Sequence, residues 1–252
     1  MPFQPTILRF DSIDSTNLEA IRQAKVGARE GLCIIAREQT LGRGRLDRTW
    51  QSPPDAGLYF SIVLRPELEI NAWPLLTLMS ALAVSDALMK ACGLRADIKW
   101  PNDLCFDDRK LCGILAETVE TVIGPAAIVG IGINLKADSL PQTVSDLATS
   151  VESATGARPD STRVLEELLK AIGERYDLLQ SPQGREHTIR EWCANSSYAM
   201  GRRVRVALGN DTFDGTTRGL EGDGALRVET QDGRIRIVRA GDVTALRATI
   251  SK

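Results

Sequence analysis

Residues 42–50, GRGRLDRTW, hold two glycines, three arginines and one tryptophan, a mixture that suits neither a helix nor a strand. Glycine lets a backbone approach a ligand closely, and consecutive exposed N–H groups form a concave surface that binds anions. Arg43, Arg45 and Arg48 add guanidinium donors that hold phosphate or carboxylate oxygens, and Trp50 adds a flat apolar ring. The stretch therefore predicts a loop that folds over a phosphorylated, partly apolar ligand. A solvated arginine-rich hairpin that touches RNA is the alternative, and a Walker loop is excluded because G-K-[ST] is missing.

Two further stretches place a lysine near groups that could bind a ligand. KWPNDL, residues 99–104, joins a lysine, an aromatic ring, a rigid turn and an Asn-Asp pair, although an Asx turn after Pro101 would explain it without a ligand. KLCGIL, residues 110–115, puts Lys110 on an otherwise apolar strand, where it could also simply extend into solvent.

Glycine and hydroxyl groups mark two more candidate binding stretches. In GIGIN, residues 130–134, the two glycines share one face of a strand, so a flat ligand could lie on it. DSTN, residues 14–17, offers hydroxyls and an amide at the start of a helix, where plain capping is the simpler interpretation. A capping box of Thr16 and Glu19 would fit that interpretation.

The elements that must position these stretches are strands and helices in alternation, followed by a β-rich tail. Strands are expected at TILRF, GLCIIARE, LYFSIVLRP, ADIKW, KLCGILAETV and AAIVGIGINL, and helices after residue 14, over 74–92 with Gly93 as the stop, over 162–179 and at HTIREWCANS. From Gly201 onward, short strand-like runs separated by GND, GDG and QDG predict a small all-β barrel.

The composition is that of a folded protein without a strong overall charge. The chain has 252 residues, of which 43% are hydrophobic and 25% charged, and a net charge of −2, so no global field draws it to nucleic acid or to a membrane. Its five cysteines include no C-x-x-C pair and it has one histidine, so no metal site is expected. Cys33 and Cys112 lie in apolar runs typical of buried thiols in a reducing, cytoplasmic setting. The longest apolar stretch contains Asp86 and predicts a core helix, and the N-terminus has no signal-peptide pattern.

Taken in order, GRGR…W, KWPNDL, K-L-x-G-I-L and GIGIN resemble the motifs of the biotin protein ligases. The resemblance runs from DSTN to the β-rich tail. It implies an α+β fold of the class II synthetase-like biotin/lipoate ligase type, with a mixed β-sheet covered by helices. The catalytic domain is expected over residues 1–198 and an SH3-like β-barrel over residues 199–252. The implied enzyme joins biotin to ATP as biotinyl-5′-AMP and then passes the biotinyl group to a lysine of a biotin carboxyl carrier protein, a domain of acetyl-CoA carboxylase or a related enzyme.

The resemblance also implies roles for individual residues. Catalysis is assigned to Lys110, Arg45 and Asp103. Biotin binding is assigned to Ser15, Thr16, Asn17, Gln39, Arg43, Gly44, Arg45 and Lys110, with Gly113, Ile114 and Leu115 as the wall of the slot and Gly130 and Gly132 as its floor. Binding of ATP and the adenylate is assigned to Arg43, Arg45, Arg48, Trp50, Lys99, Asn102, Lys110 and Asn134.

The chemistry agrees with these assignments. Lys110 and Arg45 can offset the repulsion between a carboxylate and an α-phosphate, and Asp103 can orient or deprotonate the acceptor lysine. Mg²⁺ is expected to arrive mainly on the nucleotide. Many relatives have glycine where this chain has Asp47, and an acid there lowers the net charge of the loop.

Two other functions compete with this one. A lipoyl or octanoyl ligase shares the fold, although the glycine–arginine loop favours biotin. An RNA-binding module would use the same loop and the barrel, but the tail from residue 201 offers only Phe213 for stacking on bases. Because the first strand is expected near residue 6, no DNA-binding domain and no binding to DNA are expected, nor is a membrane partner; a homodimer is possible.

Overall fold

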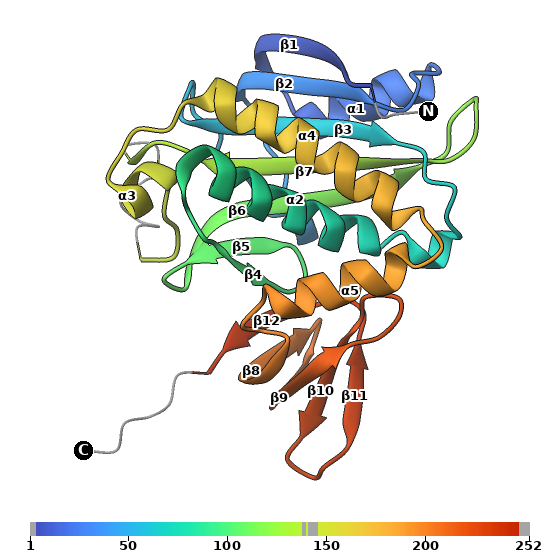
Figure 1. Ribbon diagram of the computed structural model, residues 1–252, viewed down its shortest axis with the longest axis vertical. Coiled ribbons are helices and arrows are strands. Elements are labelled where there is room, and N and C mark those ends of the chain that lie inside the picture. Colours follow the sequence, from blue (N-terminus) through green and yellow to red (C-terminus); the bar gives the residue numbers. More distant parts are fainter. Residues whose placement is uncertain (1–3, 138–139, 141–145, 247–252) are drawn as a thin grey trace.

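The computed structural model describes residues 4–137, 140 and 146–246. The outermost residues of the two predicted domains, 1–3 and 247–252, lie outside this part of the chain. Within the described part, two β-sheets and the helices that cover the larger sheet make up the architecture (Figure 1). The mixed sheet and the β-rich tail predicted from the sequence are both confirmed.

The larger sheet has seven strands among the described residues, in the order β1-β2-β3-β7-β6-β5-β4. β1 and β2 are parallel, and every other neighbouring pair is antiparallel. The strands are β1 (Thr6–Ile13), β2 (Leu32–Gln39), β3 (Gly57–Leu64), β4 (Asp97–Lys99), β5 (Asp103–Phe106), β6 (Arg109–Val119) and β7 (Ala126–Asn134).

Helices cover both faces of this sheet. On one face lie α2 (Leu75–Cys92) and α4 (Ser161–Leu179), which cross in front of the strands in Figure 1, with α5 (Gly184–Ala194) beside them. On the other face lies α1 (Thr16–Lys25), while the short α3 (Val151–Thr155), which the sequence did not predict, follows β7 at one end of the sheet.

α2 is the core helix that the sequence predicts. Of the described residues, only 70–92 form a helical segment long and apolar enough to cross a membrane, and 61% of its most apolar window is buried inside the protein. The helix ends where Gly93 adopts a left-handed φ of +65°, as expected of a glycine stop.

Successive side chains along each strand point alternately to the two faces of the larger sheet. Phe60 and Ile131 point toward α2 and join the main core, where burying each such side chain contributes about 1.5–3 kcal/mol. Ile34, Val63 and Ile128 point the other way and pack against α1. Since residues two apart on a strand share a face, the glycines of β7 lie on the α1 side, together with Ile128.

The smaller sheet contains β8 (Met200–Leu208), β9 (Asp211–Leu220), β10 (Leu226–Thr230), β11 (Ile235–Val238) and β12 (Asp242–Ala245). Its described strands are antiparallel, in the order β11-β10-β9-β8-β12, and it lies below α5 in Figure 1. Trp100 connects the two sheets, because its indole N–H donates to the Gly224 carbonyl at 3.0 Å.

Candidate active site

The predicted motifs converge on the α1 face of the larger sheet. Gly113 of β6 lies opposite Gly132 of β7, and Leu115 lies opposite Gly130. These three glycines, Gly113, Gly130 and Gly132, form what we call the glycine floor. The side chain of Ile114 points to the other face and is buried in the main core, so only its backbone faces the neighbouring turn.

The three positions of the glycine floor leave no room for a Cβ atom, because other side chains already lie against them. A Cβ atom at Gly132 would come within 2.5 Å of the Trp50 ring, and one at Gly113 within 3.0 Å of it. A Cβ at Gly130 would come within 2.0 Å of the Asn17 side-chain oxygen. The sequence predicted that a flat ligand could lie on this face, and in this structure the flat group that lies against Gly113 and Gly132 is the indole of Trp50.

The loop from residue 42 to residue 50 is held over the floor by its three arginines. Arg43 forms an ion pair with Glu117 on β6 at 3.0 Å, and Arg45 donates to the Asn102 side-chain oxygen at 3.0 Å. Arg48 pairs with Asp242 at the start of β12. Each arginine thus attaches the loop to a different part of the molecule: a sheet strand, the KWPND turn and the smaller sheet.

The electrostatic surroundings of these arginines differ. Burial lowers the pKa of the Arg45 guanidinium, while Asp242 and Asp103 act in the opposite direction. The hydrogen bond to Asp242 raises the pKa of Arg48. Arg45 is therefore the most desolvated cation of the three, and a desolvated guanidinium binds an anion more strongly than one in water.

Lys110 and Asp103 lie together beside the Trp50 ring. The Lys110 Nζ is 2.6 Å from an Asp103 carboxylate oxygen and 5.4 Å from the centre of the indole. Asp103 on β5 is paired with Gly113 on β6, so the sheet register places the carboxylate next to the floor. The three groups predicted at the reacting end, Lys110, Asp103 and Arg45, are brought to the same region.

Other predicted residues lie around this centre with partners of their own. Asn102 donates its amide to the Ile114 carbonyl at 2.7 Å, which fixes the turn that Arg45 reaches. Asn134 donates to the Thr149 carbonyl at 3.0 Å. Lys99 lies instead over the ring of Tyr198, at 5.9 Å, near the start of the smaller sheet.

The start of α1 faces the floor, and the predicted capping box is wrong. Ser15 is the N-cap but makes no side-chain capping bond, and Glu19 bonds Arg22. Thr16 instead donates its backbone N–H and its hydroxyl to the Gln39 side chain, at 2.8 and 3.0 Å. Thr16 and Asn17 therefore contact the sheet face, whereas Asp14 pairs with Arg22 on α1 itself.

A series of polar contacts, which we call the polar ring, runs from the loop to the start of α1 and back to the loop. From one end of the loop to the other it contains Arg43, Glu117, Asn17, Ser61, Thr16, Gln39 and Ser52. The Ser52 hydroxyl lies 3.3 Å from the Trp50 carbonyl, which returns the series to the loop. Sequence reasoning missed Glu117, Ser61 and Ser52, and the one available signal was Ser61, a polar residue in the apolar strand GLYFSIVL.

The carboxylates of the site do not form a metal cage. Among the described residues no three His, Cys, Asp or Glu side chains gather closely enough to hold an ion. The carboxylate at the reacting end, Asp103, is already paired with Lys110. Within the described part of the site, the carboxylates are thus paired with cations and are not gathered into a metal-binding cluster.

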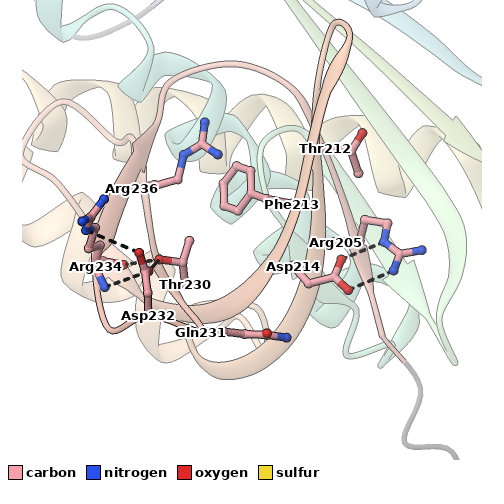
Figure 2. A pocket seen from close by; sticks show the side chains of 9 residues that line it. All are labelled: Arg205, Thr212, Phe213, Asp214, Thr230, Gln231, Asp232, Arg234 and Arg236. Carbon is pink, nitrogen blue, oxygen red and sulfur yellow. Dashed lines mark hydrogen bonds and ion pairs between the residues drawn. The ribbon is translucent and has the colours of Figure 1, made fainter.

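A hollow of about 790 Å³ lies on the smaller sheet, away from the residues described so far (Figure 2). None of the predicted site residues lines it. Its arginines are matched by acids, with Arg205 paired to Asp214 at 2.7 Å and Arg234 to Asp232 at 3.4 Å. Arg236 pairs with Asp211 at 2.7 Å, so the hollow carries no excess positive charge toward an anionic ligand.

Comparison with known proteins agrees with this geometry. Residues 9–134 match the Biotin/lipoate A/B protein ligase family, and residues 199–244 match the Biotin protein ligase C terminal domain. The chain is 35% identical over 237 residues to a biotin–[acetyl-CoA-carboxylase] ligase of Paracoccus denitrificans, covering 91% of this chain and 96% of that protein. It is 36% identical over 235 residues to the bifunctional ligase/repressor BirA of Bacillus spizizenii, covering 91% of this chain and 71% of that protein.

A solved structure extends the likeness to three dimensions. The biotin protein ligase from Aquifex aeolicus in complex with biotin and ATP is similar with a TM-score of 0.82 and 31% identity. The match covers 96% of this chain and 99% of that one. With matches to both parts of the chain and to relatives over nearly its whole length, the chain belongs to the biotin/lipoate A/B protein ligase family.

Proposed function

We propose that this chain is a biotin protein ligase, which activates biotin with ATP as biotinyl-5′-AMP and transfers the biotinyl group to a lysine of a carboxylase subunit. The relatives named above are biotin ligases, and the similar Aquifex enzyme binds biotin and ATP. The observation that supports this most is the placement of Lys110, Asp103 and Arg45 at the edge of a glycine floor under a closing loop.

The ring system of biotin would lie inside the polar ring, beside the Trp50 indole that covers Gly113 and Gly132. The Trp50 indole N–H is buried there and has no hydrogen-bond partner among the described residues. An unpaired buried donor is costly, and a ligand oxygen would satisfy it. Thr16, Asn17 and Gln39 would contact the polar end of biotin, and Trp50 would form the wall between the biotin and adenylate parts.

In the first step, a biotin carboxylate oxygen bonds to the α-phosphorus of ATP while the bond to pyrophosphate breaks. Two anions must meet for this, so Lys110 and Arg45 would offset their repulsion and the charge that develops on phosphorus. The Arg45 guanidinium is well suited to this role because burial has removed much of its water. Mg²⁺ would neutralise the departing pyrophosphate as part of the nucleotide substrate.

In the second step, the neutral amine of the acceptor lysine attacks the acyl carbon, and AMP leaves. We assign Asp103 to orient that amine and to accept its proton, because its carboxylate lies 2.6 Å from the Lys110 Nζ at the reacting end. The loop from residue 42 to residue 50 would retain the adenylate until the carrier arrives, since the mixed anhydride reacts with water.

The protein partner is a biotin-carrying carboxylase subunit, and we propose a biotin carboxyl carrier domain as the acceptor. We place the boundary between the catalytic and SH3-like domains after residue 198, in the segment that joins α5 to β8. Action in the cytoplasm and assembly as a homodimer are part of the same proposal.

Substrate choice provides the test. The purified chain should catalyse pyrophosphate exchange into ATP that depends on biotin and is not supported by lipoate or octanoate. Exchange driven by lipoate and not by biotin would assign the chain to the lipoyl branch of the family.

A further inference from the structure

Glu117 lies where the start of α1 and the loop meet, and no role in the reaction has been assigned to it so far. One of its carboxylate oxygens accepts from the Asn17 amide at 2.9 Å and from Arg43 at 3.1 Å. Its second oxygen lies 3.0 Å from the same Arg43 nitrogen. One half-buried carboxylate therefore joins two residues that the resemblance places against biotin.

The contact to Glu117 fixes which way the Asn17 amide faces. The amide nitrogen donates to Glu117 and to the Leu115 carbonyl at 3.2 Å, so the amide oxygen must face Ser61, whose hydroxyl donates to it at 2.6 Å. That oxygen lies directly over Gly130. Removing the carboxylate would leave the amide free to rotate over the floor.

The same carboxylate is the anchor of the first loop arginine. Arg43 has its ion pair with Glu117 and is itself part of the loop that covers the floor through Trp50. The side chain of Glu117 is 24% exposed and that of Arg43 37%, so this pair is more shielded from water than Arg48–Asp242, at 63% and 37%. A shielded, charge-assisted contact holds its partner more firmly than an exposed one.

We infer that Glu117 is a positioning residue for biotin activation, which joins Arg43 to Asn17 so that the closure of the loop and the shape of the biotin slot are set together. Biotin in the slot holds Asn17 in place, Asn17 holds Glu117, and Glu117 holds the first arginine of the loop. This inference rests on the proposed function.

The test compares Glu117→Ala and Glu117→Gln with Glu120→Gln, an exposed acid just past the end of the same strand. For Glu117→Ala we expect the KM for biotin to rise about tenfold, because the loss of one charge-assisted hydrogen bond changes binding by about that factor. We also expect biotinyl-5′-AMP to dissociate faster. Glu117→Gln keeps the shape and one acceptor oxygen, so its effect should be smaller. Glu120→Gln should match the wild type in both measurements.

A merely structural role would lower the melting temperature and leave the KM for biotin unchanged in the folded fraction, and this result would overturn the inference. If Glu117→Ala does not fold, the isosteric Glu117→Gln decides, since an unchanged biotin KM in that variant has the same meaning. Wild-type protein that does not bind biotin at all would instead refute the proposed function.

A double-mutant cycle makes the coupling itself measurable. If Glu117 acts on biotin through both Arg43 and Asn17, then the rise in biotin KM of the Glu117→Ala/Arg43→Ala variant should be smaller than the product of the two single-variant rises. Glu117→Ala and Arg48→Ala should multiply, because Arg48 is anchored elsewhere. Multiplication of the effects at Glu117 and Arg43 would show that the two residues act independently.

Discussion

Lys110 and Arg45 are proposed to contact the same anionic intermediate, but Lys110 lies on a strand and Arg45 lies on a loop. Lys110 lies on β6, where its backbone N–H donates to the Leu147 carbonyl at 2.8 Å and its carbonyl accepts from Thr149 at 2.9 Å. Arg45 lies on the loop, where its side chain is held by the hydrogen bond to Asn102. The two cations should therefore fail in different ways when they are removed.

Lys110→Ala should nearly abolish the formation of biotinyl-5′-AMP. It removes a charge placed where carboxylate and phosphate meet, and one such contact is worth about 3 kcal/mol, or about 10²-fold in rate. Biotin-dependent pyrophosphate exchange measures this step, with Lys90→Ala, in the last turn of α2, as the control. Exchange within threefold of the wild type would show that Lys110 is not at the reacting end.

Arg45→Gly should slow adenylate formation less than Lys110→Ala does, and it should mainly impair retention of the adenylate. The loop would lose its link to the KWPND turn, so the free adenylate would acylate exposed lysines on other proteins. Labelling of an added bystander protein, measured beside pyrophosphate exchange, separates retention from synthesis. If exchange survives and bystander labelling does not rise, the loop is not the retaining element.

At this scale the sequence reveals residue types better than their partners. Lys110 and the glycines of β7 could be named because they interrupt apolar runs, whereas the role of Asp103 followed from the resemblance to the biotin protein ligases. Glu117 and Ser52 could not, because their roles depend on contacts with Arg43 and Gln39, residues that are distant along the chain. The capping box failed for a similar reason, since Gln39 competes for Thr16.

Among the elements, the loop between β2 and β3 carries backbone strain. Leu46 and Asp47 have φ of +55° and +56°, in the left-handed region that favours glycine. The glycine that many relatives have at position 47 agrees with this, and Asp is one of the residues that tolerates the region best. The three arginine anchors hold the loop in this shape.

Leu46→Gly should therefore make the closed loop more stable. Leucine in the left-handed region costs about 1–2 kcal/mol, and this side chain is 67% exposed, so little packing is lost. A gain of about 1 kcal/mol should slow tryptic cleavage at the loop arginines about fivefold. Leu41→Gly is the matched control, because Leu41 is 65% exposed and has no positive φ. Cleavage of Leu46→Gly as fast as that of Leu41→Gly would show that the strain is not stored there.

Most elements were predictable because each has a strong local pattern. α2 is apolar along its whole length and stops at Gly93, and β6 and β7 are long runs of strand-forming residues. α3 was missed because five residues carry too little periodicity for a helix to be read from sequence.

For the whole molecule, described residues of the smaller sheet reach the surroundings of the active site. Asp242 of β12 pairs with Arg48 of the loop. The carbonyl of Gly224, between β9 and β10, accepts a hydrogen bond from the indole N–H of Trp100 in the KWPND turn. The order of elements predicts two sheets, but it does not predict that β12 contacts the loop of residues 42–50. Such contacts depend on how the sheets pack, which the pattern along one chain does not specify.

Gly224→Ala should weaken the attachment of the smaller sheet. Gly224 has φ +83°, and a Cβ there would come within 2.9 Å of the Leu78 side chain. Strain and overpacking together should cost about 2 kcal/mol in the free energy of unfolding, measured by urea denaturation. Gly222→Ala, with open space around its Cβ, should stay within about 0.5 kcal/mol of the wild type. Equal stability of the two variants would contradict the packing described at this contact.

The most direct test of the whole account is mass spectrometry of a carrier domain incubated with this protein, biotin and Mg·ATP. We expect a gain of one biotinyl group on one lysine, which disappears without ATP, with lipoate in place of biotin, or with Lys110→Ala. A carrier that gains a lipoyl or octanoyl group but no biotinyl group, or that stays unmodified while biotinyl-5′-AMP accumulates, would contradict it.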